Sequence, residues 1–248
     1  MRETGEVRNA HQLEREEVMS IGKTIRALAL LAVCACAVAP AAGTGSASPP
    51  VNTPELAIAP DAVADTLLVD VQTLAPSIVV ELRYGTVNNF TGAPLPGYEG
   101  NHAYLRREAA RALASVESDL REAGLALKVF DAYRPVRATL AMVDWTQRVN
   151  RPDLLTNGYI ASRSRHNLGL AIDLTLVDIT TGRELEMGTP FDTFSAAAHT
   201  ANATGVAATN RQKLKAAMER RGFVNYDQEW WHFSYEVPNP LRFDRIVH

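Results

Sequence analysis

An acidic residue interrupts an otherwise apolar stretch of the chain, Leu170–Leu176, whose sequence is LAIDLTL. The alternation predicts a strand with Asp173 among small side chains on one face and the large aliphatic side chains on the other. Burying a carboxylate is costly unless it is paired or bound to a metal. His166 lies seven residues earlier, and a turn at Gly169 would bring its imidazole over the face that carries Asp173. Both residues are therefore candidate metal ligands.

A second acid and imidazole occur together near the other end of the chain, in Glu229-Trp230-Trp231-His232. Catalytic zinc takes three protein ligands and leaves a fourth position for water. His166, Asp173 and His232, the His–Asp–His triad, meet that requirement. Residues three apart on a regular strand point to opposite faces, so Glu229 and His232 share a site only if the backbone turns between them. We predict such an irregularity near Trp230.

Each of these residues also has an ordinary structural interpretation. Asp173 alone is as well explained by a hydrogen-bonded structural carboxylate, and a lone histidine is more often a core or surface residue than a ligand. Glu229 alone fits a charge at a strand edge, and its tryptophan neighbours fit core positions. We expect His102 and His199 not to be ligands, because neither lies in the paired motifs.

Several elements are predicted around these residues from periodicity and from the positions of glycine and proline. Thr209-x-x-Gln212 fits a capping box for a helix that ends before Gly222. The predicted strands are 78–82, 125–131, 170–176 and 230–237, the predicted helices are 105–123 (closed by Gly124), 135–148 and one from 209, and 88–100 is a predicted loop. Helices and strands are interspersed without regular βαβ alternation. We therefore expect an α+β fold, with one domain built on a central, mostly antiparallel sheet flanked by helices.

Composition sets limits on the possible partners. The chain is 46% hydrophobic and 21% charged with a net charge of −3, which is ordinary globular composition. The sequence has no stripe of lysine and arginine residues, so a nucleic-acid partner is not expected. We divide the chain into an N-terminal extension with a signal segment (1–47), a linker (48–60) and one domain (61–248).

The N-terminal region reads as a secretory signal. Lys23 and Arg26 precede the apolar run Ala27–Val38, which small residues and prolines follow. The run is shorter than the ~20 residues of a membrane span, which makes an uncleaved anchor the weaker alternative. Cleavage sites of the A-x-A type occur at 39–41 and, less well placed, at 45–47. We expect an exported protein of the periplasm or cell envelope.

Both cysteines, Cys34 and Cys36, lie inside this segment, so cleavage after it leaves no disulfide. A lipoprotein processed at Cys36 is the alternative, and contact with a membrane is expected only through the signal segment or such a lipid anchor. Acidic residues crowd the first eighteen positions, which favours Met19 as the start. A metal site in the folded part must then use His, Asp and Glu, as catalytic zinc sites do.

Two motifs resemble those of the zinc DD-peptidases. Residues 164–173 have the form S-x-H-x-x-G-x-A-x-D, and E-x-W-H follows at 229–232. Further segments resemble the D-alanyl-D-alanine dipeptidase (VanX-type) family in the same order, so the resemblance covers roughly 65–237. These segments are ELRY (81–84), NFTG (89–92), DAYRP (131–135), GYIAS (158–162) and MGTPFD (187–192).

The resemblance implies the zinc fold of the DD-peptidases and hedgehog-like proteins, with one zinc ion per chain held by the His–Asp–His triad. It implies that Glu229 is the general base towards a zinc-bound water and that Arg134 stabilises the developing oxyanion. Ser164 and Asp192 would hold the two ends of the substrate, with Asp192 at its free ammonium.

The activity implied is hydrolysis of D-Ala-D-Ala or a related D-amino-acid dipeptide. A D,D-carboxypeptidase or endopeptidase acting on peptidoglycan stem peptides is the first alternative. A non-catalytic zinc or cell-wall binding module is the second, and the presence of Glu229 and Arg134 argues against it. The segment 145–157 is shorter than expected for the resistance-type enzymes, which leaves the preferred substrate side chains open.

Overall fold

The structure is a computed structural model that describes residues 56–248. The expected signal segment, with both cysteines, lies outside the described residues, and the division into extension, linker and domain stays a prediction. Residues of the expected linker take part in the fold, because β1 (Ile58–Ala59) pairs in parallel with β9 (Arg242–Phe243). None of the helices between residues 56 and 248 has the length and apolar character needed to cross a membrane.

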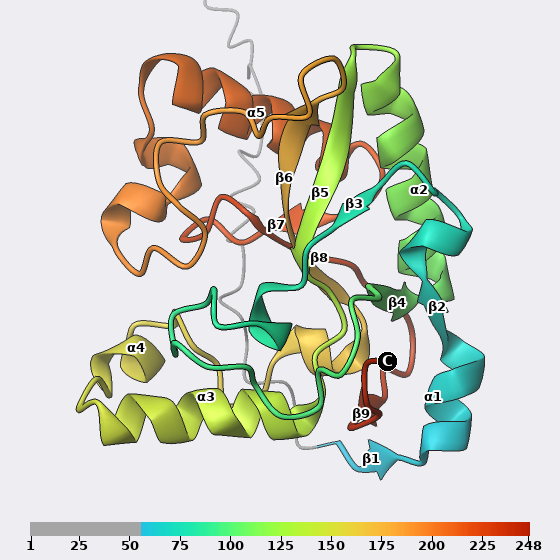
Figure 1. Cartoon of the computed structure of the whole chain (residues 1–248), viewed down its shortest axis with the longest axis vertical. Helices are drawn as coiled ribbons and strands as arrows, with labels where there is room; N and C mark the ends of the chain where they lie inside the picture. Colours follow the sequence, from blue (N-terminus) through green and yellow to red (C-terminus); the bar gives the residue numbers. More distant parts are fainter. Residues whose placement is uncertain (1–55) are drawn as a thin grey trace, which may run out of the picture. The chain divides into compact units, whose positions relative to one another are not determined.

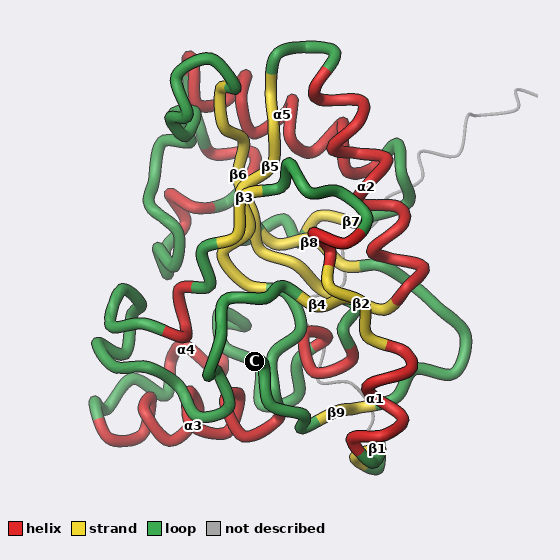
Figure 2. The backbone as a smooth tube through the Cα atoms, turned by 45° about the vertical axis from the view of Figure 1, so that its right-hand side comes forward, coloured by secondary structure: helices red, strands yellow, loops and turns green. Residues whose placement is uncertain are grey.

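A five-stranded sheet in the order β3-β5-β6-β8-β7 carries the site. Only β3 and β5 run parallel; the other three pairs are antiparallel, so the predicted mostly antiparallel sheet is confirmed. A separate antiparallel pair, β2 with β4, lies beside it (Figure 2). The bounds of these strands are β2 Leu68–Asp70, β3 Val79–Val80, β4 Tyr104–Arg106, β5 Leu125–Asp131, β6 Ala171–Asp178, β7 Val224–Asn225 and β8 His232–Ser234.

The helices lie at two ends of the sheet (Figure 1). At one end α2 and α5 contact each other and the strands, and at the other end α3 packs with the short α4. Their bounds, with that of the first helix, are α1 Asp61–Leu67, α2 Arg107–Arg121, α3 Val136–Arg148, α4 Asp153–Thr156 and α5 Gly205–Glu219. The arrangement is the α+β fold expected from the sequence.

The core lies between the sheet and α2. The helical positions predicted to face inward in α2, such as Leu113 and Val116, are fully buried. In β6 both faces are buried, and both edges are paired, with β5 on one side and β8 on the other. Asp173 therefore lies in an enclosed environment rather than at a solvated face.

Three predicted boundaries are wrong. Leu105 belongs to β4, where it pairs with Val69, so α2 begins at Arg107; a buried leucine fits either element. α5 begins at Gly205, and Thr209 is inside it, with its hydroxyl bonded to the Gly205 carbonyl one turn earlier. The last predicted strand is shorter than 230–237, since β8 covers only His232–Ser234.

Candidate active site

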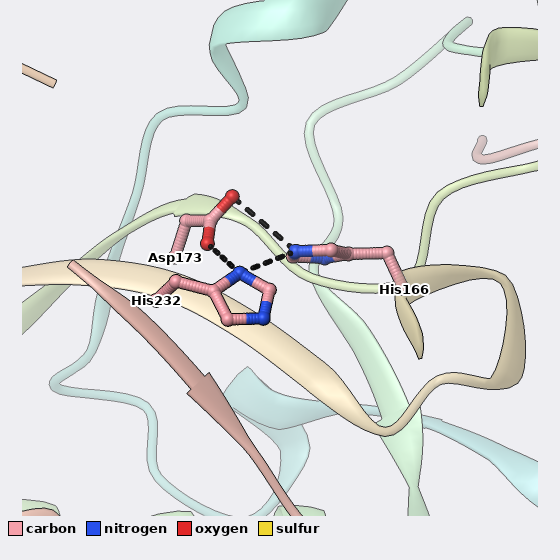
Figure 3. A group of neighbouring side chains, drawn as sticks. All are labelled: His166, Asp173 and His232. Atoms are coloured by element: carbon pink, nitrogen blue, oxygen red, sulfur yellow. Dashed lines mark hydrogen bonds and ion pairs between the residues drawn. The ribbon is translucent and has the colours of Figure 1, made fainter. Parts of the chain in front are cut away.

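The structure brings the three residues of the His–Asp–His triad together (Figure 3). One potential ligand atom from each residue lies within 4.8 Å of the other two, and all three side chains are buried. Asp173 Oδ1 is 2.9 Å from His232 Nδ1, and Asp173 Oδ2 is 3.4 Å from His166 Nε2. The two imidazole nitrogens are 3.2 Å apart.

Local backbone geometry explains this convergence. In the β6–β8 ladder Asp173 pairs directly with His232, so their side chains share one face. His166 lies in a 3-10 turn, η3 (Arg165–Leu168), which Gly169 ends with a left-handed φ of 64°. A Cβ at Gly169 would lie 2.5 Å from a methyl group of Leu68, so the turn requires glycine.

The backbone irregularity predicted near Trp230 is confirmed. Trp230 and Trp231 form a turn rather than a strand, and the His232 N–H donates to the Glu229 carbonyl at 3.2 Å. This turn lets Glu229 and His232 face the same cavity although they are three residues apart. The Glu229 Oε2 atom lies 3.9 Å from His232 Nδ1.

The donor set fits a zinc ion. His166 Nδ1 is 2.6 Å from the Ala132 carbonyl oxygen, which assigns the ring proton to Nδ1 and leaves Nε2 free to coordinate. Burial lowers the pKa of His232 and keeps that imidazole neutral. Burial opposes ionisation of Asp173, but His166 and His232 outweigh it and hold the pKa of this carboxyl below its usual range. Two neutral imidazoles and one carboxylate form a common ligand set for catalytic zinc.

Glu229 and Arg134 lie beside the triad. Burial, together with the charges of Asp173 and Asp192, raises the pKa of Glu229 well above its ordinary value. Arg134 is 8% exposed, and its Nη2 lies 3.7 Å from Asp173 Oδ2. Asp131 orients this guanidinium: Oδ2 accepts a hydrogen bond from Nε at 2.9 Å and forms an ion pair with Nη2 at 2.8 Å. A proton acceptor and a fixed positive charge thus face the same point.

The two expected substrate-binding residues also line this cavity. Ser164 is buried, and its Oγ accepts from the His166 N–H at 3.3 Å. Asp192 Oδ1 accepts a hydrogen bond from the Tyr84 hydroxyl at 2.9 Å, while its buried Oδ2 has no partner among residues 56–248. Burial raises the pKa of Asp192 to about 8. Because Oδ2 has no partner, Asp192 has an oxygen available for a cationic group, and a nearby positive charge would favour its carboxylate form.

The cavity itself is small and partly aromatic. Its volume is about 30 Å³. Besides the seven expected site residues, its lining consists of Tyr84, Phe90, Met142, Tyr159, Ile160, Ala161, Phe194 and Trp231. A ligand in this cavity would therefore contact both charged groups and aromatic rings.

Two supporting residues were not identified from the sequence. Tyr84 donates to Asp192 and lies under the Arg134 guanidinium, 4.8 Å from its ring centroid, and Asp131 orients Arg134. The family-like segments 81–84 and 131–135 contain them, and that is the signal that was available. His102 pairs with Asp70 at 2.7 Å, and His199 lies 3.3 Å from the Tyr159 hydroxyl. Neither belongs to the triad.

Comparison with known proteins gives consistent matches. Residues 64–240 match the family described as D-ala-D-ala dipeptidase, Peptidase_M15. A D-alanyl-D-alanine dipeptidase of Enterococcus faecium is 36% identical over 169 residues, 62% of this chain and 83% of that protein. One of Escherichia coli is 36% identical over 184 residues, 73% of this chain and 90% of that protein. The solved structure of the LD-carboxypeptidase LdcB aligns with a TM-score of 0.38 at 19% identity, covering 53% of this chain and 59% of that one.

Proposed function

Because the chain belongs to the D-alanyl-D-alanine dipeptidase family and is a metallopeptidase, we propose that it hydrolyses D-Ala-D-Ala or related D-amino-acid dipeptides with one zinc ion. The observation that carries this proposal is the convergence of the His–Asp–His triad with Glu229 and Arg134 in one buried cavity. Binding a metal requires only the triad; a carboxylate of raised pKa and a fixed cation beside it are what peptide hydrolysis needs.

The triad would hold the zinc ion. A zinc ion at such a site lowers the pKa of a bound water to about 7 and polarises a carbonyl. Glu229 is the proton carrier: burial and the neighbouring acids raise its pKa, so this carboxylate accepts a proton more readily than an exposed glutamate and can release it to the leaving amine. Its position 3.9 Å from His232 keeps that proton next to the reacting groups.

Arg134 supplies positive charge for the oxygen of the scissile carbonyl. A guanidinium remains protonated in proteins, and the hydrogen bond and ion pair with Asp131 fix its orientation before the substrate arrives. Such preorganised donors act most strongly where water is excluded, as in this cavity.

The ends of the substrate meet groups of matching chemistry. Asp192 would accept hydrogen bonds from the free ammonium through its unpartnered Oδ2, and Tyr84 holds the other oxygen. The Ser164 hydroxyl would donate to the carboxylate at the opposite end. A site that binds both the free ammonium and the carboxylate of a dipeptide favours dipeptides over the stem peptides of the alternative function.

The proposal is tested by incubating the purified protein with D-Ala-D-Ala, with zinc and after chelation, beside a Glu229→Gln variant. Zinc-dependent release of D-alanine that the variant lacks is the expected result. Wild-type protein that binds one zinc but releases no D-alanine would refute the dipeptidase function, and cleavage of a stem pentapeptide by the same preparation would establish the alternative. Zinc content and melting temperature of the variant serve as controls for folding.

A further inference from the structure

Arg211 is a buried cation that the proposed mechanism does not use. It lies on α5, is 1% exposed and is absent from the lining of the cavity. Its bonds go to carbonyl and hydroxyl oxygens, with no carboxylate partner among residues 56–248. Nε donates to Met187 O at 2.7 Å, Nη1 to His199 O at 2.7 Å, and Nη2 to Ala197 O at 3.0 Å and Thr189 Oγ1 at 3.4 Å. Burying a charge is costly unless such bonds compensate it.

All four acceptors belong to one segment, residues 187–199, which we call the 187–199 loop. Two acceptors lie at its beginning and two at its end, so one guanidinium joins both ends of the loop. Asp192 lies between them and has a left-handed φ of 60°, which is unfavourable for a residue other than glycine. A strained conformation persists only when the surrounding structure enforces it.

The loop is also joined to the turn that carries Glu229. Trp230 Nε1 donates to Thr189 Oγ1 at 2.9 Å, and the Trp230 N–H donates to the Ala198 carbonyl at 3.1 Å. Thr189 Oγ1 therefore accepts from both Arg211 and Trp230. Through these bonds the position of Asp192 is fixed relative to Glu229.

We propose that Arg211 is a positioning residue for substrate recognition. By bridging the ends of the 187–199 loop it holds Asp192 where this carboxylate meets the substrate ammonium, without contacting the substrate itself. This inference rests on the proposed dipeptidase function and on the role of Asp192 within it.

The kinetic test uses Arg211→Met, which keeps an unbranched side chain but removes the donors, and Lys213→Met, an exposed position on the same helix, as the control. For D-Ala-D-Ala we expect KM to rise and kcat/KM to fall about 10- to 100-fold, as for loss of a charge-assisted hydrogen bond, with kcat much less affected. For N-acetyl-D-Ala-D-Ala, which lacks the ammonium, we expect R211M and wild type to be equal. The R211M/D192N double variant should be no worse than D192N.

A second readout does not depend on activity. Hydrogen exchange of the backbone amides in the 187–199 loop should be faster in R211M, while exchange in β5 and β6 stays unchanged. If R211M does not fold, Thr189→Val takes its place; it removes the acceptor shared with Trp230 and should show the same pattern to a smaller extent.

Three outcomes would overturn the inference: unchanged exchange in the loop, equal losses on the acetylated and free dipeptides, or additive effects of R211M and D192N. Wild-type protein without dipeptidase activity is a different result. It would refute the proposed function, and with it the recognition role of Arg211, while the exchange experiment still decides whether Arg211 holds the loop.

Discussion

Replacing Arg134 by methionine should separate two roles of its guanidinium, namely pairing with Asp131 and stabilising the oxygen of the scissile carbonyl. In the structure it forms a hydrogen bond and an ion pair with Asp131, which is completely buried, and its Nη2 lies 3.7 Å from Asp173 Oδ2. Without Arg134, Asp131 keeps only the Tyr98 hydroxyl at 2.6 Å and His166 Nδ1 at 3.3 Å. The variant therefore leaves a buried carboxyl group without its cation.

The expected size of each effect follows from these contacts. Breaking a buried ion pair by removing one partner costs about 3–5 kcal/mol of unfolding free energy. Losing a preorganised oxyanion donor lowers kcat about 10²- to 10³-fold. A double variant, D131N/R134M, removes the unpaired charge and should recover most of the stability, whereas its kcat should stay as low as that of R134M.

The stability of R134M should also depend on pH in a defined direction. Burial raises the pKa of Asp131 and Arg134 opposes the rise, so loss of Arg134 raises this pKa further. The folded variant then binds a proton that the unfolded chain has released, and its stability falls more steeply with increasing pH than that of wild type.

Urea unfolding of the metal-free proteins at pH 5 and pH 8, with kcat measured on the zinc-loaded proteins, tests all three statements. The decisive comparison is between the activity and the stability of the D131N/R134M double variant. If it regains activity together with stability, Arg134 acts only as the partner of Asp131, and its assignment to the carbonyl oxygen is wrong. Equal stability of R134M and wild type would contradict the estimate for the buried pair.

Three further predictions concern the same site. Chelation should lower the melting temperature measured by calorimetry, and zinc at a thousand times its Kd should restore about 4 kcal/mol of unfolding free energy. An unchanged melting temperature would show that the triad does not bind the metal. Burial raises the pKa of Asp192 to about 8, so the folded chain keeps a proton that the unfolded chain releases, and stability falls as pH rises between the two pKa values. The D192N variant should make the melting temperature less dependent on pH in this range. An unchanged pH dependence would contradict the raised pKa. Gly169→Ala should destabilise the protein by more than about 1 kcal/mol in urea unfolding, because the added Cβ would lie 2.5 Å from Leu68. It should also weaken zinc binding, because the turn carries His166. Normal zinc affinity of the variant would show that the turn is not required.

Local patterns were sufficient to predict several of the elements around the triad. β5 covers 125–131 as expected, and α3 begins within one residue of its predicted start, because periodicity and Pro135 act over a few residues. The backbone turn at Trp230 also followed from a local argument, namely that Glu229 and His232 must share a face.

Contacts between distant segments could not be predicted in this way. Tyr84 and Asp192 are 108 residues apart, and nothing near either residue indicates their hydrogen bond. The same holds for Leu105, since its place in β4 depends on pairing with Val69 rather than on its own neighbours. Tertiary pairing overrode the helical periodicity there, as it often does at the end of an element.

The spacing of the triad along the chain has a consequence for folding kinetics. His166 and Asp173 are joined by one local turn, whereas His232 follows Asp173 by 59 residues and reaches it only when β8 pairs with β6. Long-range pairing of this kind forms slowly, so at most two of the three ligands are close together early in folding. An interaction absent from the folding transition state leaves the folding rate unchanged and retards unfolding. Zinc would then extend the lifetime of the native state without speeding its formation.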